Sequence, residues 1–474
     1  MLNDMVRLAF GFVFAIGLFW AAAGSKPGPD ARLAGGSREP EKNGWIQVRL
    51  KGTPREVGYQ HGYLLAGEIA DAHRAVKLAF EHDTKRPYAF FRQASEQVLW
   101  PKVVGEYREE ILGIAEGLKA KGVKLDVADV VFLNAWNELV PYYLNWHDAQ
   151  KGVKPAVKLS APEHCSAFVA TGSYTKDGRV VMGHNAWTGY MEGQRWNILF
   201  EIQPAQGHGI FMDGYPGMIH SGDDFGMNTA GLMITETTIS NFHGFDPAGV
   251  PEFVRARQAM QYAGSIDDFA RIMKTGNNGG YANTWLVADR NTNEIAELEL
   301  GLKNVTLKRT RDGYFVGSNF AQDPKLIREE TEFPVDDKSI SANARRMRWE
   351  QLMAEYKGRI DVAAGQRFLA DHYDAYAKQE DAASERTLCG HIDESPRGVA
   401  GWQSPYAAAG AVQNKVADAA MAEKMTMSAA MGHACGRHFK AEAHVKAHPE
   451  FGWQRGVLRD LPAGGWTVFA ARGR

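Results

Sequence analysis

A change of pattern near residue 150 constrains the fold of this chain more than any other sequence feature. Before it, residues 45–143 carry mostly helical periodicity. After it, short apolar runs lie between Gly- and Asp-containing turns, a pattern that predicts buried strands, and helical stretches come in pairs. Strands in runs with helices in pairs favour a layered α+β fold over a doubly wound sheet.

The predicted elements follow from these patterns. Within the first part, amphipathic stretches predict helices at 63–69, 90–118 and 127–144. Later helices are predicted at 251–262, 266–274, 341–356 and 362–369. Strands are predicted at 165–170, 179–183, 196–202, 232–235, 284–288, 294–300 and 314–317, with two more around a turn in 410–431. Residues 151–162, with two prolines and several lysines, predict an exposed connector.

Residues 1–24 are typical of an export signal. Arg7 precedes an apolar run from Leu8 to Trp20, and small residues at 21–24 offer a cleavage site. The run is marginal as an N-terminal anchor, because a spanning helix needs about 20 apolar residues. Residues 25–44, rich in Gly, Pro and charge, predict a flexible leader. We expect an exported protein, periplasmic or secreted from a bacterial source and lysosomal from a eukaryotic one.

Charge and cysteine content narrow the partners. The 474 residues carry a net charge of −2 with no basic cluster, so we expect no nucleic-acid partner. The three cysteines are Cys165, Cys389 and Cys435. A Cys389–Cys435 disulfide would leave Cys165 free, but both residues fit equally well as small buried side chains.

Cys165 opens a predicted apolar strand directly after the connector. A cysteine there is most often structural. Around it, however, polar residues lie at the ends of other apolar strands, which is how a site is held on a rigid scaffold. These residues are His184, Asn185, Asp223, Asp224, Glu236, Thr237 and Asn283.

Five segments in this order resemble the phospholipase B-like family. They are Cys165-Ser166-Ala167, 183–187, 215–225, 235–239 and 281–285. The flanks are similar to the acyl-coenzyme A:isopenicillin N acyltransferase family, at 52–54, 58–62, 387–391 and 425–432. Both families belong to the N-terminal-nucleophile superfamily. The resemblance therefore implies an α+β fold with a four-layer αββα sandwich.

The resemblance also implies that the chain cuts itself between His164 and Cys165. Residues 45–164 would then form a mainly helical N-terminal fragment, and residues 165–474 the chain that bears the nucleophile. The free amine of Cys165, with a pKa of about 7.7–8.0, could take the proton of its own thiol. We expect the fragment to stay bound, because it carries much of a helical layer.

Roles for the other residues follow from the same resemblance. Asn283 is the predicted oxyanion donor, and losing such a donor raises a barrier by about 3–4 kcal/mol. His184 is assigned a catalytic role. Asn185 and Trp187 would line the pocket or steer the thiol. Glu236 and Thr237 could orient the amine, whereas Asp223 and Asp224 are as well suited to holding a turn. Thr188 stands where related cysteine hydrolases carry an acidic residue, which leaves the group that orients the amine open.

The predicted function is cleavage of acyl ester bonds in phospholipids, with Trp187, Tyr215 and Trp285 near the acyl site. An amidase or acyltransferase acting on N-acyl amides is the alternative, and a non-catalytic lipid-binding member of the same fold is another. No metal or organic cofactor is implied, since His433-x-Cys435-x-x-His438 is too sparse a cluster to predict a metal site.

Overall fold

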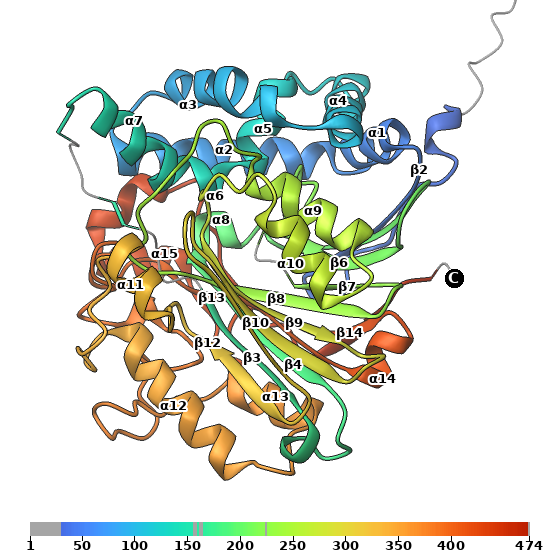
Figure 1. The fold of residues 1–474 in the computed structure, drawn as a ribbon. Coiled ribbons are helices and arrows are strands. Elements are labelled where there is room, and N and C mark those ends of the chain that lie inside the picture. Colours follow the sequence, from blue (N-terminus) through green and yellow to red (C-terminus); the bar gives the residue numbers. More distant parts are fainter. Residues whose placement is uncertain (1–29, 155–158, 161–164, 223–224, 473–474) are drawn as a thin grey trace, which may run out of the picture.

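Two β-sheets packed face to face form the centre of the protein (Figure 1). The computed structural model describes residues 30–154, 159–160, 165–222 and 225–472. Within these residues one sheet has nine strands, in the order β1 (Ser37–Arg38), β2 (Ile46–Gly52), β5 (Ile198–Pro204), β6 (Ile210–Gly214), β7 (Gly226–Asn228), β8 (Leu232–Thr238), β9 (Asn283–Asp289), β10 (Glu294–Leu300) and β11 (Val305–Thr310). The other has six, in the order β12 (Gly313–Gly317), β3 (Cys165–Thr171), β4 (Val181–Gly189), β13 (Ala409–Asp418), β14 (Thr426–Met431) and β15 (Thr467–Ala470).

Helices cover the outer face of each sheet. The nine-stranded sheet is covered by α1 (Pro54–Leu64), α2 (Ala66–Thr84), α3 (Tyr88–Ala94), α4 (Gly105–Ala120), α5 (Val127–Asn134), α6 (Trp136–Glu138), α9 (Glu252–Tyr262) and α10 (Ile266–Lys274). The six-stranded sheet is covered by α12 (Ser341–Glu355) and α13 (Val362–Leu369). Smaller helices are α7 (Leu144–Gln150), α8 (Tyr190–Gly193), α11 (Pro324–Glu330), α14 (Ala419–Glu423) and α15 (Ala441–Ala447). The predicted four-layer αββα sandwich is confirmed.

The space between the sheets is filled by the alternate side chains of facing strands. Ala167 and Val169 of β3 pack in one cluster with Leu199, Phe211 and Leu286 of the nine-stranded sheet. The intervening Phe168 packs instead in the cluster beneath α12 and α13. Because side chains alternate along a strand, this pattern tells which residues of each strand face the space between the sheets.

Two expectations for the N-terminal part are wrong. Residues 46–52, predicted within a helical region, form β2, in which Ile46, Val48 and Leu50 are buried and alternate with more exposed polar residues. That alternation is the strand period, not the helix period. The leader predicted as flexible is also partly structured, because residues 37–38 pair with β2 as β1 and Asp30 accepts a hydrogen bond from the Tyr59 hydroxyl at 2.7 Å. Residues 1–24 lie outside the described residues, so export remains a prediction.

The glycines of the 58–62 segment have a structural reason. Helices α1 and α4 cross so closely that a Cβ added at Gly58 would lie 1.8 Å from the Glu110 carbonyl oxygen, and one at Gly62 would lie 2.0 Å from that of Ile114. Only glycine fits at such a backbone contact. The glycines of this motif therefore serve the packing of the helical layer.

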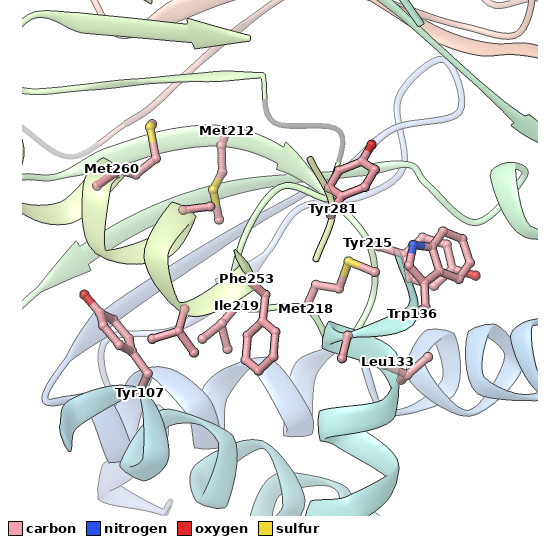
Figure 2. Close-up of a cluster of buried hydrophobic side chains, with 14 of the residues drawn as sticks. Tyr107, Leu133, Trp136, Met212, Tyr215, Met218, Ile219, Phe253, Met260 and Tyr281 are labelled. Carbon is pink, nitrogen blue, oxygen red and sulfur yellow. The ribbon is translucent and has the colours of Figure 1, made fainter. Parts of the chain in front are cut away.

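The N-terminal part is packed tightly against the rest of the chain. Figure 2 shows Tyr107, Leu133 and Trp136 from its helices against side chains of the later chain: Met212, Tyr215, Met218, Ile219, Phe253, Met260 and Tyr281. Strand β2 pairs in parallel with β5 over seven residues. The buried Arg257 of α9 lies 3.2 Å from the Glu110 carboxylate of α4. The two parts thus share one sheet and one core.

We therefore predict that a cut in the connector leaves both pieces together. A site for a specific protease placed in the exposed residues 151–154 would allow the cut without relying on self-processing. The two pieces should co-elute in gel filtration under native conditions and separate only in denaturant, because separation would expose the shared core. Elution of the larger piece alone would contradict the prediction.

A second prediction concerns His61 of α1, which is buried. Its Nε2 accepts a hydrogen bond from the Gly217 backbone N–H at 3.0 Å, and its ring lies against Phe200. Burial lowers the pKa of His61 to about 3. The unfolded chain binds a proton below a pKa of about 6.5 and the folded chain does not. Stability is therefore full above about pH 6.5 and falls by about 1.4 kcal/mol per pH unit below it.

The test is denaturant unfolding of wild type and His61→Gln at pH 7.5 and pH 5. Between these values His61 should cost the wild type about 2 kcal/mol of unfolding free energy. Glutamine keeps an acceptor and does not titrate, so His61→Gln should lose less stability on acidification by that amount. Equal losses in the two proteins would refute the assignment.

Candidate active site

Cys165 is the first residue of β3 and is buried. Its cross-strand partner is Ala186 of β4. Cys165 shares a strand face with Ala167 and Val169, which pack between the sheets. The thiol therefore belongs to the inter-sheet face, at the end of the strand. The residue before it, His164 of the predicted cleavage site, lies outside the described residues.

Two buried side chains hold the backbone of Cys165. Its N–H donates to the Asn319 Oδ1 at 3.2 Å, and its carbonyl oxygen accepts from the Arg345 Nη1 at 2.6 Å. Arg345 Nη2 also donates to that Asn319 oxygen at 3.0 Å. Arg345 is fully buried on α12 and stacks its guanidinium 4.2 Å from the Trp187 ring centre. Both ends of the Cys165 residue are thus fixed by polar contacts.

Sequence reasoning missed Asn319 and Arg345. Asn319 follows the end of β12, so the signal that selected the other candidates, a polar residue at the end of a buried strand, could have found it. Arg345 lies within a helix at 341–355 whose sequence carries several arginines. Nothing in that pattern distinguishes the one that turns inward.

Asn185 and Trp187 lie on the outer face of the six-stranded sheet. The Asn185 Oδ1 accepts from the Ser166 N–H at 3.0 Å, and its Nδ2 donates to the Leu388 carbonyl at 2.6 Å. Asn185 thus ties Ser166, the residue after Cys165, to the loop that contains Leu388. The Trp187 ring lies against the Arg345 guanidinium, which donates to the Cys165 carbonyl. Both side chains therefore support the backbone around Cys165.

His184 of β4 lies on the inter-sheet face. Its strand partners are Ala167 of β3 and Lys415 of β13. Burial, with a smaller contribution from the charge of Lys415, holds the pKa of His184 well below its usual value. Among the described residues neither ring nitrogen has a hydrogen-bond partner. His184 is therefore neutral at pH 7, and it is a weaker base than an ordinary imidazole.

A buried ion pair joins the two sheets on the same face. Lys415 Nζ lies 2.8 Å from the Asp213 carboxylate of β6, and neither side chain is exposed. Gln413 Nε2 donates to the same oxygen at 2.8 Å, and the Ser221 hydroxyl donates to the other at 2.5 Å. Asp223 and Asp224, predicted near this region, lie outside the described residues.

Asn283 and Glu236 lie on the helix-covered face of the nine-stranded sheet, as their strand neighbours show. Trp285 and Val287 of β9 pack beneath the helices, whereas Leu286 and Ala288 face the other sheet. The Asn283 amide, with its nitrogen turned toward acceptors, donates to the Glu236 Oε2 at 2.9 Å. Its role as an oxyanion donor remains a prediction.

Thr237 and Asn319 connect this region to the β3 strand that carries Cys165. Thr237 lies on the inter-sheet face, so close to Gly317 of β12 that a Cβ there would lie 2.4 Å from its Oγ1. Gly317 pairs with Ala167 of β3. Asn319 Nδ2 donates to the carbonyl of Thr238, the strand partner of Asn283. Of the two residues predicted to orient the amine, Thr237 lies on the face that Cys165 uses.

The aromatic residues predicted near an acyl site lie in different places. Trp285 lies on the helix-covered face of its sheet, where it packs against Phe269 of α10 with ring centres 5.4 Å apart. Tyr215 packs against Trp136 with ring centres 4.9 Å apart, and Trp136 lines a cavity of about 410 Å³. Side chains alternate along β9, so Trp285 faces the helices as Val287 does.

This cavity lies at the end of β4, the strand that pairs with β3, and Cys165 is not among its lining residues. Ser160 of the connector and Thr188-Gly189 at the end of β4 line one side. Aromatic side chains line much of the rest: Phe80, Trp136, Trp402, Phe451 and Trp453. Polar side chains also line it, among them the acidic Asp83 and Glu192 and the basic Lys85. Burial, followed by the charge of Asp83, raises the pKa of Glu192 to about 8. The size and lining fit a small ligand with both apolar and polar groups.

Comparison with known proteins confirms the resemblance drawn from the motifs. The phospholipase B family matches residues 82–308. A putative phospholipase B-like 1 of Caenorhabditis elegans is 32% identical over 30% of this chain and 25% of its own. The acyl-coenzyme A:6-aminopenicillanic-acid-acyltransferase 40 kDa form of Emericella nidulans is 27% identical over 54% of this chain and 63% of its own.

Two further similarities complete the comparison. An uncharacterized protein of Archaeoglobus fulgidus is 25% identical over 73% of this chain and 62% of its own length. The chain thus spans less than two thirds of the curated relatives it matches. A mutant of conjugated bile acid hydrolase from Clostridium perfringens is a structural neighbour with a TM-score of 0.34 and 11% identity, over 56% of this chain and 88% of that one. Across the described residues, no helix is long and apolar enough to cross a membrane.

Proposed function

Starting from this similarity to phospholipase B-like proteins and acyltransferases, we propose that the chain is a self-processing cysteine hydrolase. Its nucleophile is Cys165 and its substrates are acyl esters of phospholipids. One observation carries the proposal: a buried cysteine opens β3 with its N–H and carbonyl each held by a buried polar side chain, Asn319 and Arg345.

The self-cleavage step balances without a cofactor. The Cys165 sulfur attacks the His164 carbonyl carbon, the C–N bond breaks, and the thiol proton passes to the departing nitrogen. Water then opens the thioester, which leaves a carboxylate on His164 and returns the thiol. Cys165 now carries a free amine. The uncut chain is inactive, because an amide nitrogen cannot act as a base.

The same atoms then serve substrate. The amine takes the thiol proton, the sulfur attacks the acyl carbonyl, and the alcohol leaves with that proton. Water hydrolyses the thioester with the amine as base, and the free fatty acid departs. Asn319 Oδ1 already accepts from this nitrogen before the cut, so it can accept from the amine afterwards and fix its lone pair relative to the thiol.

The aromatic cavity at the end of β4 supports a fatty-acyl substrate. Its aromatic lining suits an acyl chain, and its volume of about 410 Å³ fits a ligand of modest size. N-acyl amides are the second candidate, because Asp83 and Glu192 in the same cavity could accept hydrogen bonds from an amine product. The acyltransferase similarity favours this second reading as well.

A substrate panel tests the proposal. Purified protein, with its cut checked by denaturing mass spectrometry, is assayed with phospholipids and N-acyl amines of stepped acyl length. We expect fatty-acid release that depends on chain length, with esters preferred, and none from Cys165→Ala. Correctly cut protein that turns over no member of either series would overturn the proposal and favour a lipid-binding protein of the same fold.

A further inference from the structure

Four metal-binding side chains from separate parts of the sequence meet at one point, outside the site already described. They are His372, Cys389, His391 and Cys435, and one ligand atom of each lies within 4.8 Å of the others. His372 follows α13, Cys389 and His391 lie before the β13 strand, and Cys435 follows β14. Cys389 and His391 are buried, while His372 and Cys435 are half-buried.

The two imidazoles face each other in an arrangement that one cation could bridge. Their Nε2 atoms are 3.2 Å apart. His372 Nδ1 lies 3.0 Å from the Asp381 carboxylate, and His391 Nδ1 lies 3.6 Å from that of Glu394. The Asp381 carboxylate favours a proton on His372 Nδ1, which leaves the Nε2 lone pair of that ring for a ligand bond. The 3.2 Å contact suits a cation bound by both rings or, without a cation, a hydrogen bond from one Nε2 to the other.

Two of the ligand-to-ligand distances match a tetrahedral zinc site, and all four ligand atoms lie within 4.8 Å of one another. With Zn–N of about 2.0–2.1 Å and Zn–S of about 2.3 Å, tetrahedral angles place two nitrogens about 3.3 Å apart and a nitrogen and a sulfur about 3.6 Å apart. The structure has 3.2 Å between the nitrogens and 3.5 Å between Cys435 Sγ and His391 Nε2. Two thiolates and two imidazoles form a set that selects zinc over oxygen-seeking cations.

We propose that His372, Cys389, His391 and Cys435 bind a structural zinc ion. The four protein ligands fill the tetrahedron, so no position is open for water or substrate. His433 also stacks on His391 with ring centres 3.8 Å apart. It is not a ligand in this proposal, because its Nε2 is bound to the Tyr190 hydroxyl at 2.8 Å and its Nδ1 lies 3.3 Å from the Cys389 carbonyl oxygen.

Such an ion would fix the loop that supports the nucleophile. Leu388, next to Cys389, accepts the hydrogen bond of Asn185, which in turn holds the Ser166 N–H. Gly390 approaches Trp187 so closely that a Cβ would lie 2.2 Å from the indole. The zinc would therefore anchor, at one loop, two of the side chains that position the Cys165 segment.

A Cys389–Cys435 disulfide is the competing arrangement. In the structure both cysteines are free thiols. A disulfide would consume both sulfurs and leave only two imidazoles, which do not make a closed zinc site. The two arrangements exclude each other, so one experiment separates them.

Elemental analysis of the full-length protein by mass spectrometry, after dialysis against trace zinc, is the test. We expect about one zinc per chain, with Cys389 and Cys435 both alkylated after unfolding in chelator. A strong chelator should lower Tm, and added zinc should restore it. Cys435→Ser and His372→Gln, at the half-buried ligands, should lose the zinc, whereas the matched control Cys165→Ala should keep it.

Either of two results would overturn the proposal. The first is wild-type protein with no bound zinc after dialysis, at a Tm that chelator does not change. The second is a Cys389–Cys435 disulfide in a non-reducing peptide map. Neither readout depends on enzyme activity, so failure of the proposed hydrolase function would leave the zinc proposal standing, and the reverse also holds.

Discussion

Cys165→Ala should remain one uncut chain and lose at least about 10⁴-fold in hydrolysis. The sulfur is both the group that attacks the preceding carbonyl and the group that attacks substrate, so its removal stops both reactions. Denaturing mass spectrometry should show a single species beside the two fragments of the wild type, the second beginning at Cys165. A fatty-acid release assay on the same preparations checks the second part.

Two controls separate lost chemistry from lost structure. Cys165→Ala removes one buried sulfur and keeps the backbone groups of residue 165, whose N–H donates to Asn319 and whose carbonyl accepts from Arg345. Its Tm should therefore stay close to that of the uncut precursor. Cys165→Ser keeps a nucleophile of lower reactivity and should cut itself more slowly. An alanine variant that is cut as the wild type is would place the nucleophile elsewhere.

The strands that carry the site could be predicted because the local sequence of each shows the pattern of a buried strand. The run from Cys165 to Ala170 is mostly apolar and is buried throughout, as expected for a strand between two layers. Strand β2 could also have been predicted from its sequence, since Ile46, Val48 and Leu50 alternate with polar residues. It was missed because the helical pattern that follows it outweighed this short alternation.

The groups around the nucleophile were harder to predict, because tertiary structure brings them from far along the chain. Asn319 and Arg345 reach Cys165 from 154 and 180 residues away. For Asn283 the residue was easy to select but its position was hard to predict. Its motif is distinctive, but strand alternation places it with Trp285 on the helix-covered face. A motif identifies residues that belong together, and only the strand register tells which face each one occupies.

The zinc cluster lies beyond sequence reasoning for the same physical reason. Zinc sites are recognised in sequence by short spacings within one loop or helix. Here the ligands come from three segments, and only Cys435 of the spacing His433-x-Cys435-x-x-His438 takes part. Asp381 and Glu394, the carboxylates that orient the imidazoles, are ordinary surface acids until the fold places them beside His372 and His391.

Lys415→Met should lower the free energy of unfolding by about 3–5 kcal/mol. The substitution keeps much of the side-chain volume but removes the ammonium that lies 2.8 Å from Asp213, at a position where neither side chain is exposed. The Asp213 carboxylate then stays buried with one cation fewer, and the Gln413 and Ser221 hydrogen bonds do not replace the charge. Urea unfolding at pH 7 measures the loss.

The second substitution decides whether the loss is electrostatic. Lys415→Met combined with Asp213→Asn removes both charges, so the double variant should be more stable than Lys415→Met alone. A surface pair provides the matched control: Lys440 and Asp460 lie at the same 2.8 Å but are 63% and 51% exposed. Lys440→Met should cost at most about 1 kcal/mol, because water screens that pair. Asp213→Asn alone completes the comparison. If the double variant loses the sum of the losses of Lys415→Met and Asp213→Asn, the ion pair does not hold the sheets together. The cost of Lys415→Met must then come from packing.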